Sequence, residues 1–298
     1  MDRVKKKNFF IIFSLTLLLF LGLLISNSGI LTPISIYFLN GKESIFNSDV
    51  GMYFESVESI TFFKYFGVEL KNIRSTMSFE SSLTYALSLF QLILPFIVSL
   101  TGLRIFDFHN KIGSMIYYRK DKFRSFYLKN VVRTSLEISL SIFSAFSVYF
   151  IICLVLFGGR YDAYHIETDF LLDILGNNFY YRSIHLYYFV LGIVQFFFIP
   201  FVLSFFSGTL PLVFSNKKLV AIGPLVYYFG LAVLTFPIIS LFSRSGNMIG
   251  LLLNPSAIMA VGDYTKVPSL LMLLSNSIPL LLGLFIIFYG TGSKHVEV

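Results

Sequence analysis

Six apolar stretches, each close to twenty residues or longer, restrict the fold of this 298-residue chain more than any other feature. They cover about residues 8–25, 83–103, 134–157, 185–214, 219–242 and 270–289. A bilayer core about 30 Å thick needs roughly 20 helical residues, because each residue rises about 1.5 Å. Charged residues make up only 13% of the chain, about half the share found in soluble domains. The sequence therefore predicts an all-α polytopic membrane protein, with residues 1–298 forming a single transmembrane domain.

The connecting segments carry a strong charge bias that predicts the orientation. The segments on the same side of the membrane as the N-terminus hold 15 basic and 4 acidic residues. The segments on the opposite side hold 8 basic and 11 acidic residues. Basic connections stay in the cytoplasm. The sequence thus predicts six spans with both ends inside, and the net charge of +7 indicates topology rather than nucleic-acid binding. The inside segments are residues 1–7, 104–133, 215–218 and 290–298.

The first span follows a basic start, Arg3–Lys7, and has no small-residue cleavage site after it. We therefore expect a retained signal-anchor helix. The fourth stretch is long and contains Pro200 and Pro211, which predict a tilted or kinked helix because proline removes a backbone donor.

Two connections predicted to lie outside have unusual sequences. Residues 26–82 form a loop too long and too mixed for a simple turn, so we expect a small external subdomain. Residues 247–266 include an apolar stretch interrupted at Asn254 and Pro255. That stretch is too short to span, which predicts a re-entrant segment before the last span.

A search for catalytic motifs predicts that the chain is not an enzyme. The four histidines are far apart in sequence, and neither a nucleophile elbow nor a nucleotide-binding loop occurs, so no catalytic, cofactor-binding or metal-binding residue is predicted. The only cysteine, Cys153, lies in an apolar run and is interpreted as a packing residue. Glu137 is an acidic residue inside a span. It is a candidate for function, but Arg133 four residues earlier favours an interfacial ion pair or a snorkelling arrangement.

The inside connection 104–133 contains the most distinctive local pattern. Aromatic residues at helical spacing alternate with basic residues, which predicts a short amphipathic helix at the cytoplasmic surface. Its basic residues suit anionic headgroups, and its aromatic stripe suits docking into a protein groove. The residues assigned to this surface are Arg119, Lys120, Lys122, Phe123, Arg124, Phe126, Tyr127 and Lys129.

This layout resembles the permease subunit of ABC-2-type ATP-binding-cassette transporters. The resemblance rests on Asp107, Gly113, the basic run Arg119–Arg124 and Lys129 in the cytoplasmic connection, and on Leu251–Pro255 before the last span. The sequence departs from the family's pattern at His109–Lys111, where acidic residues are usual. The seven residues before the first span are also fewer than in the family's polysaccharide exporters.

The resemblance implies a function for the chain. A separate ABC ATPase subunit would bind ATP and dock on the coupling helix, and a second permease protomer, identical or homologous, would complete the path. The cargo would be amphipathic or apolar, such as a peptide, toxin, drug or lipid-like molecule, exported across a bacterial plasma membrane. Two alternatives remain open: a standalone immunity or peptide-sensing protein that uses residues 26–82, and an intramembrane enzyme.

Overall fold

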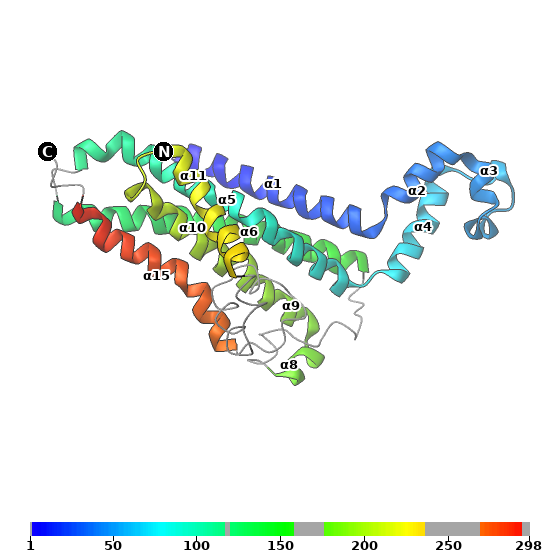
Figure 1. The fold of residues 1–298 in the computed structure, drawn as a ribbon. Coiled ribbons are helices and arrows are strands. Elements are labelled where there is room, and N and C mark those ends of the chain that lie inside the picture. Colours follow the sequence, from blue (N-terminus) through cyan, green and yellow to red (C-terminus); the bar gives the residue numbers. More distant parts are fainter. Residues whose placement is uncertain (1, 117–119, 158–175, 236–268, 294–298) are drawn as a thin grey trace. The chain divides into compact units, whose positions relative to one another are not determined.

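The computed structural model describes residues 2–116, 120–157, 176–235 and 269–293, and every regular element among them is helical. Four long helices dominate: α1 (Asp2–Ser28), α5 (Phe79–Ile116), α6 (Lys120–Phe157) and α15 (Ser269–Ser293) (Figure 1). A helix satisfies its own backbone hydrogen bonds, which a chain in lipid requires. The all-helical prediction is therefore confirmed for the described residues.

Five helical stretches are long and apolar enough to cross a bilayer. They are Asn8–Ser28, Leu89–Asn110, Phe123–Phe157, Ile184–Leu212 and Lys217–Thr235. Each includes most of one of the first five predicted spans, which indicates a multi-pass membrane protein. The sixth predicted span corresponds to α15, which has 25 residues. Among its described side chains the apolar stretch is Ser277–Tyr289, which is shorter than the five stretches above.

The fourth stretch is one helical path with two irregular turns. It begins with α9 (Ile184–Ile193), passes through a π-helical segment η5 (Val194–Phe198), and continues as α10 (Ile199–Thr209) and a short 3₁₀ turn η6 (Leu210–Leu212). The π-helical segment ends two residues before Pro200, and the 3₁₀ turn contains Pro211. Proline offers no N–H to the turn before it, so the hydrogen-bond register shifts there.

The fifth stretch has the same kind of irregularity. Helix α11 (Lys217–Leu225) begins after Asn216, whose side-chain oxygen accepts a hydrogen bond of 2.9 Å from the backbone N–H of Lys218. Pro224 lies inside this helix, and a second π-helical segment, η7 (Val226–Gly230), follows directly. A proline-linked change of register is thus shared by both stretches.

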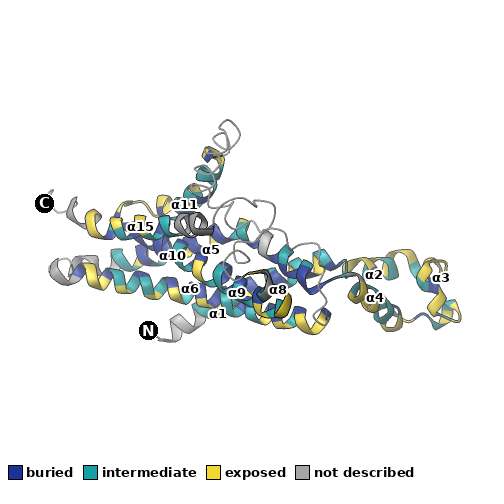
Figure 2. Ribbon diagram, turned by 90° about the horizontal axis from the view of Figure 1, so that it is seen from below, coloured by how far each residue is buried: buried dark blue, intermediate teal, exposed yellow. Residues whose placement is uncertain are grey.

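Inter-residue contacts divide the chain into two compact units. The larger one comprises residues 1–16, 87–147 and 165–298. In it α15 lies beside α10 (Figure 1), and nearly all of α10 is buried (Figure 2). Gly283 of α15 allows this approach, because an added Cβ would lie 2.9 Å from the ring of Phe205. Helix α10 is thus buried within this unit and packs closely against one face of α15.

The smaller unit comprises residues 17–86 and 148–164, and it includes the predicted external subdomain. Helix α1 ends at Gly29, whose φ of +67° is the left-handed conformation that commonly ends helices. The chain then forms α2 (Leu31–Ser35), η1 (Ile36–Asn40), α3 (Gly41–Phe46), two 3₁₀ turns (Asp49–Tyr53 and Val57–Ser59) and α4 (Phe62–Thr76).

These short elements share a small core of their own. Ile45, Ile60 and Tyr65 are buried there, with Tyr37 and Phe54 packed against them. These short elements therefore pack around a shared apolar core, and the external subdomain 26–82 stays a prediction.

We expect Tyr65 to make this small core sensitive to alkaline pH. Burial of the phenol, and the charge and hydrogen-bond acceptance of nearby Glu69, raise its pKa from 10.0 to about 12. A raised pKa in the folded state stabilises the fold below the ordinary value of about 10, and this stabilisation is lost as the pH rises through about 12. Hydrogen exchange of α4 in the full chain should accelerate across this range in the wild type, and Tyr65→Phe should remove that part of the pH dependence.

The structure differs from the sequence prediction in the connection 104–133. We predicted a short surface helix separate from the third span, but residues 120–157 form one helix of 38 residues. No glycine or proline lies between Lys120 and Phe157, so nothing in the sequence interrupts the helix. The predicted re-entrant segment 247–266, with Asn254 and Pro255, lies outside the described residues.

Candidate functional site

The first turns of α6 meet the end of α5 and three other elements at a shared apolar cluster. Its buried residues are Ile105 of α5; Phe123, Tyr127 and Val131 of α6; Phe205 of α10; Leu212 of η6; and Ile287 of α15. The Tyr127 hydroxyl donates a hydrogen bond of 2.8 Å to the backbone carbonyl of Gly208 in α10. We call this set the hairpin-base cluster, because α5 and α6 form a helical hairpin at this end of the molecule.

The cluster divides the predicted docking residues into two groups. Phe123 is 7% exposed and Tyr127 is 2% exposed, so both rings face the protein's own helices. Arg124, Phe126 and Lys129 are exposed, and the ring of Phe126 stacks on Phe108 of α5 at a centroid distance of 5.8 Å. A partner could therefore contact the second group directly, whereas Phe123 and Tyr127 can act only through the helices that they hold together.

The remaining predicted docking residues lie at the start of the hairpin's second arm. Lys120 and Lys122 are in the first turn of α6, and Arg119 lies outside the described residues. Their role stays a prediction.

Glu137 forms an ion pair with Arg104, which the sequence pattern did not indicate as its partner. The pair joins Glu137 of α6 to Arg104 of α5, with an N···O distance of 3.5 Å and side chains that are 20% and 27% exposed. We expected Arg133, one helical turn earlier, as the partner. The antiparallel packing of α5 and α6 brings the Arg104 guanidinium to the carboxylate, so the interaction links two helices.

We expect this pair to be a modest link between α5 and α6. Arg104→Gln and Glu137→Gln should each lower stability, and the double variant should lose less than the sum, with a coupling of about 1 kcal/mol. A double-mutant cycle of unfolding in detergent measures this coupling. Additive losses would show that the two side chains do not interact in the folded protein.

A second ion pair ties the start of α11 to α5. The Lys217 ammonium lies 2.7 Å and 3.0 Å from the two carboxylate oxygens of Asp107, and both side chains are half-exposed. Asp107 is one of the residues that carry the family resemblance. An exposed pair of this kind contributes at most about 1 kcal/mol, so it orients the first turn of α11 more than it stabilises the fold.

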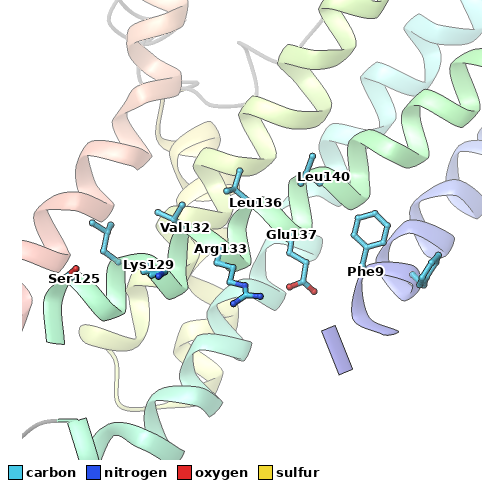
Figure 3. Close-up of a pocket in the computed structure, with 10 residues that line it drawn as sticks. Phe9, Ser125, Lys129, Val132, Arg133, Leu136, Glu137 and Leu140 are labelled. Carbon is cyan, nitrogen blue, oxygen red and sulfur yellow. The ribbon is translucent and has the colours of Figure 1, made fainter. Parts of the chain in front are cut away.

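An open groove of about 930 Å³ runs between the beginning of α1 and one face of α6 (Figure 3). The groove was not predicted. The helical spacing of its α6 residues could have indicated a shared face, but only tertiary packing places Phe9 and Phe10 opposite them. The lining residues are Phe9 and Phe10 from α1, and Ser125, Leu128, Lys129, Val132, Arg133, Leu136, Glu137 and Leu140 from α6.

Within the described part of the chain, no three histidine, cysteine, aspartate or glutamate side chains are close enough to hold a metal ion. His109 lies edge-on to Phe123 and Tyr127, with ring centroids 6.2 Å apart in each case, as part of the aromatic packing of the hairpin. Cys153 is buried, consistent with a packing role. The prediction that the chain is not an enzyme stays a prediction.

No protein-family model matches the chain, and neither a curated protein nor a solved structure resembles it significantly. The class of protein that can be stated is therefore the one its helices indicate, a multi-pass membrane protein. The resemblance to ABC-2-type permeases stays a hypothesis.

Proposed function

We propose that the chain is the permease subunit of an ATP-driven exporter in a bacterial plasma membrane. In this proposal six helices span the bilayer, α15 is the last of them, and both ends of the chain are cytoplasmic. The charge bias of the connections supports this orientation. A separate ABC ATPase would supply the energy, and a second permease protomer would complete the path for an amphipathic or apolar cargo.

The unbroken helix α6 is the observation that carries the proposal. It runs from Lys120 to Phe157, about 57 Å at about 1.5 Å per residue, which is nearly twice the roughly 30 Å bilayer core. Its basic first turns therefore project beyond the membrane, and the same helix continues through it. A force applied to the exposed residues near Arg124 would reach the transmembrane part of α6 directly.

The hairpin-base cluster would distribute that force to other helices. Phe123 and Tyr127 pack against α10 and α15, and the Tyr127 hydroxyl bonds the α10 backbone. Closely packed interiors transmit displacement because they are nearly incompressible. We therefore assign ATPase contact to the exposed Arg124 and Phe126, and transmission to the buried Phe123 and Tyr127.

Co-purification tests the proposal. The wild-type chain, purified in mild detergent from its native host, should retain an ATPase that carries a nucleotide-binding loop. Arg124→Glu with Phe126→Ala should reduce that retention at least tenfold, because it reverses a charge and removes an exposed ring at the docking surface. The matched control is Phe63→Ala with Lys64→Glu, two exposed positions in α4, which should retain the ATPase. Absence of such an ATPase from the wild type, or equal retention by both variants, would contradict the docking assignment.

The compact subdomain supports a second candidate function, a standalone immunity or peptide-sensing protein. The buried core around Tyr65 gives residues 26–82 a defined surface, which a simple linker would not need. This candidate requires no ATPase. Replacing residues 26–82 with a flexible linker should abolish immunity or peptide sensing. Purification of the wild type without an ATPase, together with this loss, would favour the second candidate over the exporter.

A further inference from the structure

The groove between α1 and α6 combines an apolar wall with two basic side chains. Phe9, Phe10, Leu136 and Leu140 form much of the wall, Arg133 lies near the middle of the groove, and Lys129 lies farther toward the start of α6 (Figure 3). Lys129 and Arg133 are four residues apart, so they share a face of α6. This separation of apolar and cationic parts is the complement of a molecule with a hydrocarbon tail and an anionic head.

Among the described residues that line the groove, the basic side chains outnumber the acidic one. Glu137 also lines the groove, but its carboxylate is paired with Arg104 of α5 at 3.5 Å. Lys129 and Arg133 are exposed, and neither forms an ion pair with another described side chain. Two cations therefore remain for an anion.

The groove extends from the headgroup level into one leaflet of the bilayer. From Lys129 to Leu140 the helix advances about 16 Å at about 1.5 Å per residue, and one leaflet contributes about 15 Å of hydrocarbon. With the predicted third span beginning near residue 134, Lys129 lies at the level of the headgroups and Leu140 about 9 Å inside the hydrocarbon. A volume of about 930 Å³ is at the upper end of the range of about 300–1,000 Å³ for small-molecule sites. The groove therefore has the capacity for the part of an acyl chain that is nearest the headgroup.

We propose that this groove is a binding site for an anionic phospholipid. The phosphate accepts hydrogen bonds from Lys129 and Arg133, and an acyl chain lies along Phe9, Leu136 and Leu140. Basic pockets between transmembrane helices bind anionic headgroups in this way. The proposal uses the membrane orientation given above but not the ATPase, so loss of the ATPase proposal would leave it standing.

Lipid binding by the delipidated full-length protein tests the site. The protein in detergent is titrated with phosphatidylglycerol or with phosphatidylcholine, and bound lipid is counted by native mass spectrometry while the melting temperature is recorded. The wild type should bind phosphatidylglycerol at least tenfold more tightly than phosphatidylcholine, and its melting temperature should rise. Raising the salt concentration should reduce this preference.

Two variants separate the charged from the apolar part of the site. Lys129→Ala with Arg133→Ala should lower phosphatidylglycerol affinity at least tenfold and leave phosphatidylcholine binding unchanged. Leu136→Trp, which fills the groove without changing charge, should weaken both lipids. The matched control is Lys71→Ala with Arg74→Ala, which removes two exposed cations from α4 and should bind lipid as the wild type does.

Three outcomes would overturn the proposal. The first is equal affinity of the wild type for the two lipids. The second is an unchanged phosphatidylglycerol affinity in the Lys129→Ala and Arg133→Ala variant while its melting temperature without lipid matches the wild type. The third is a wild-type dimer that binds no lipid and that Leu136→Trp dissociates, which would assign the groove to a second copy of the chain.

Discussion

Replacing Tyr127 with alanine should destabilise the folded protein by about 3–5 kcal/mol, as expected when a large buried ring is removed. Tyr127 is 2% exposed and lies where α6 meets α10 and α15. The substitution leaves a cavity among Phe123, Phe205 and Ile287 and removes the hydrogen bond to Gly208. Unfolding by denaturing detergent in mixed micelles measures the loss.

Tyr127→Phe is the matched control, because it keeps the ring and removes only the hydroxyl. We expect it to cost about 1 kcal/mol, the usual net value of one intramolecular hydrogen bond. If Tyr127 transmits motion from the docking surface, Tyr127→Ala should also reduce cargo export per ATP hydrolysed while ATPase retention stays near the wild-type level. An alanine variant as stable as the phenylalanine variant would contradict the buried position of this ring.

Replacing Gly102 with leucine is expected to separate α5 from α10 and α11. A Cβ at this position would lie 2.8 Å from the backbone carbonyl oxygen of Ser207 and 2.9 Å from Cγ1 of Val220. Because one of these atoms belongs to a helix backbone, the contact cannot be relieved by turning a side chain. Overpacking of this kind costs about 1–3 kcal/mol, and the bulk of a leucine places the expected loss at the upper end or beyond. Thermal unfolding in detergent should show a lowered melting temperature.

Gly22 in α1 provides the control for that substitution. It is exposed, and an added Cβ would meet no atom within 4 Å. Gly22→Leu should therefore keep the wild-type melting temperature or raise it slightly, since glycine is a poorer helix former than leucine. Equal losses at both positions would mean that the close approach at Gly102 is absent in the folded protein.

Hydrophobicity alone predicted the five helices that are long and apolar enough to cross a bilayer, because a bilayer requires long apolar segments whose backbone groups bond to one another. Pro200 and Pro211 also correctly indicated where the fourth stretch is irregular. The length and mixed composition of residues 26–82 agree with the small core around Ile45, Ile60 and Tyr65, and the external subdomain stays a prediction.

Tertiary packing explains the features that the sequence did not predict. The basic aromatic segment was interpreted as a separate surface helix, since its charge resembles that of an interfacial helix. With no residue to interrupt it, the segment instead extends α6, and Phe123 and Tyr127 turn toward α10 and α15. Likewise, Arg133 was the local choice of partner for Glu137, but Arg104 approaches from the neighbouring helix. No pattern along the chain specifies which helices become neighbours.

Helix α6 thus brings together three features at one end of the protein. Its first turns expose Arg124, Phe126 and Lys129, its inner face holds the hairpin-base cluster, and its outer face lines the groove opposite α1. In the proposed function a docked ATPase, the transmembrane helices and a bound lipid would all act on the same helix. Lipid occupancy would then influence coupling, because all three share one rigid element.

The central claim is that the hairpin of α5 and α6 faces the cytoplasm while the subdomain 26–82 faces outside. Its most direct test is cysteine accessibility in intact cells, which is simplified because Cys153 is the only native cysteine and is buried. Asn47→Cys should react with a membrane-impermeant maleimide in intact cells. Ser125→Cys and Ser215→Cys should react only after the membrane is opened. The account would be contradicted if Ser125→Cys were labelled in intact cells, whether Asn47→Cys were protected or labelled to the same extent.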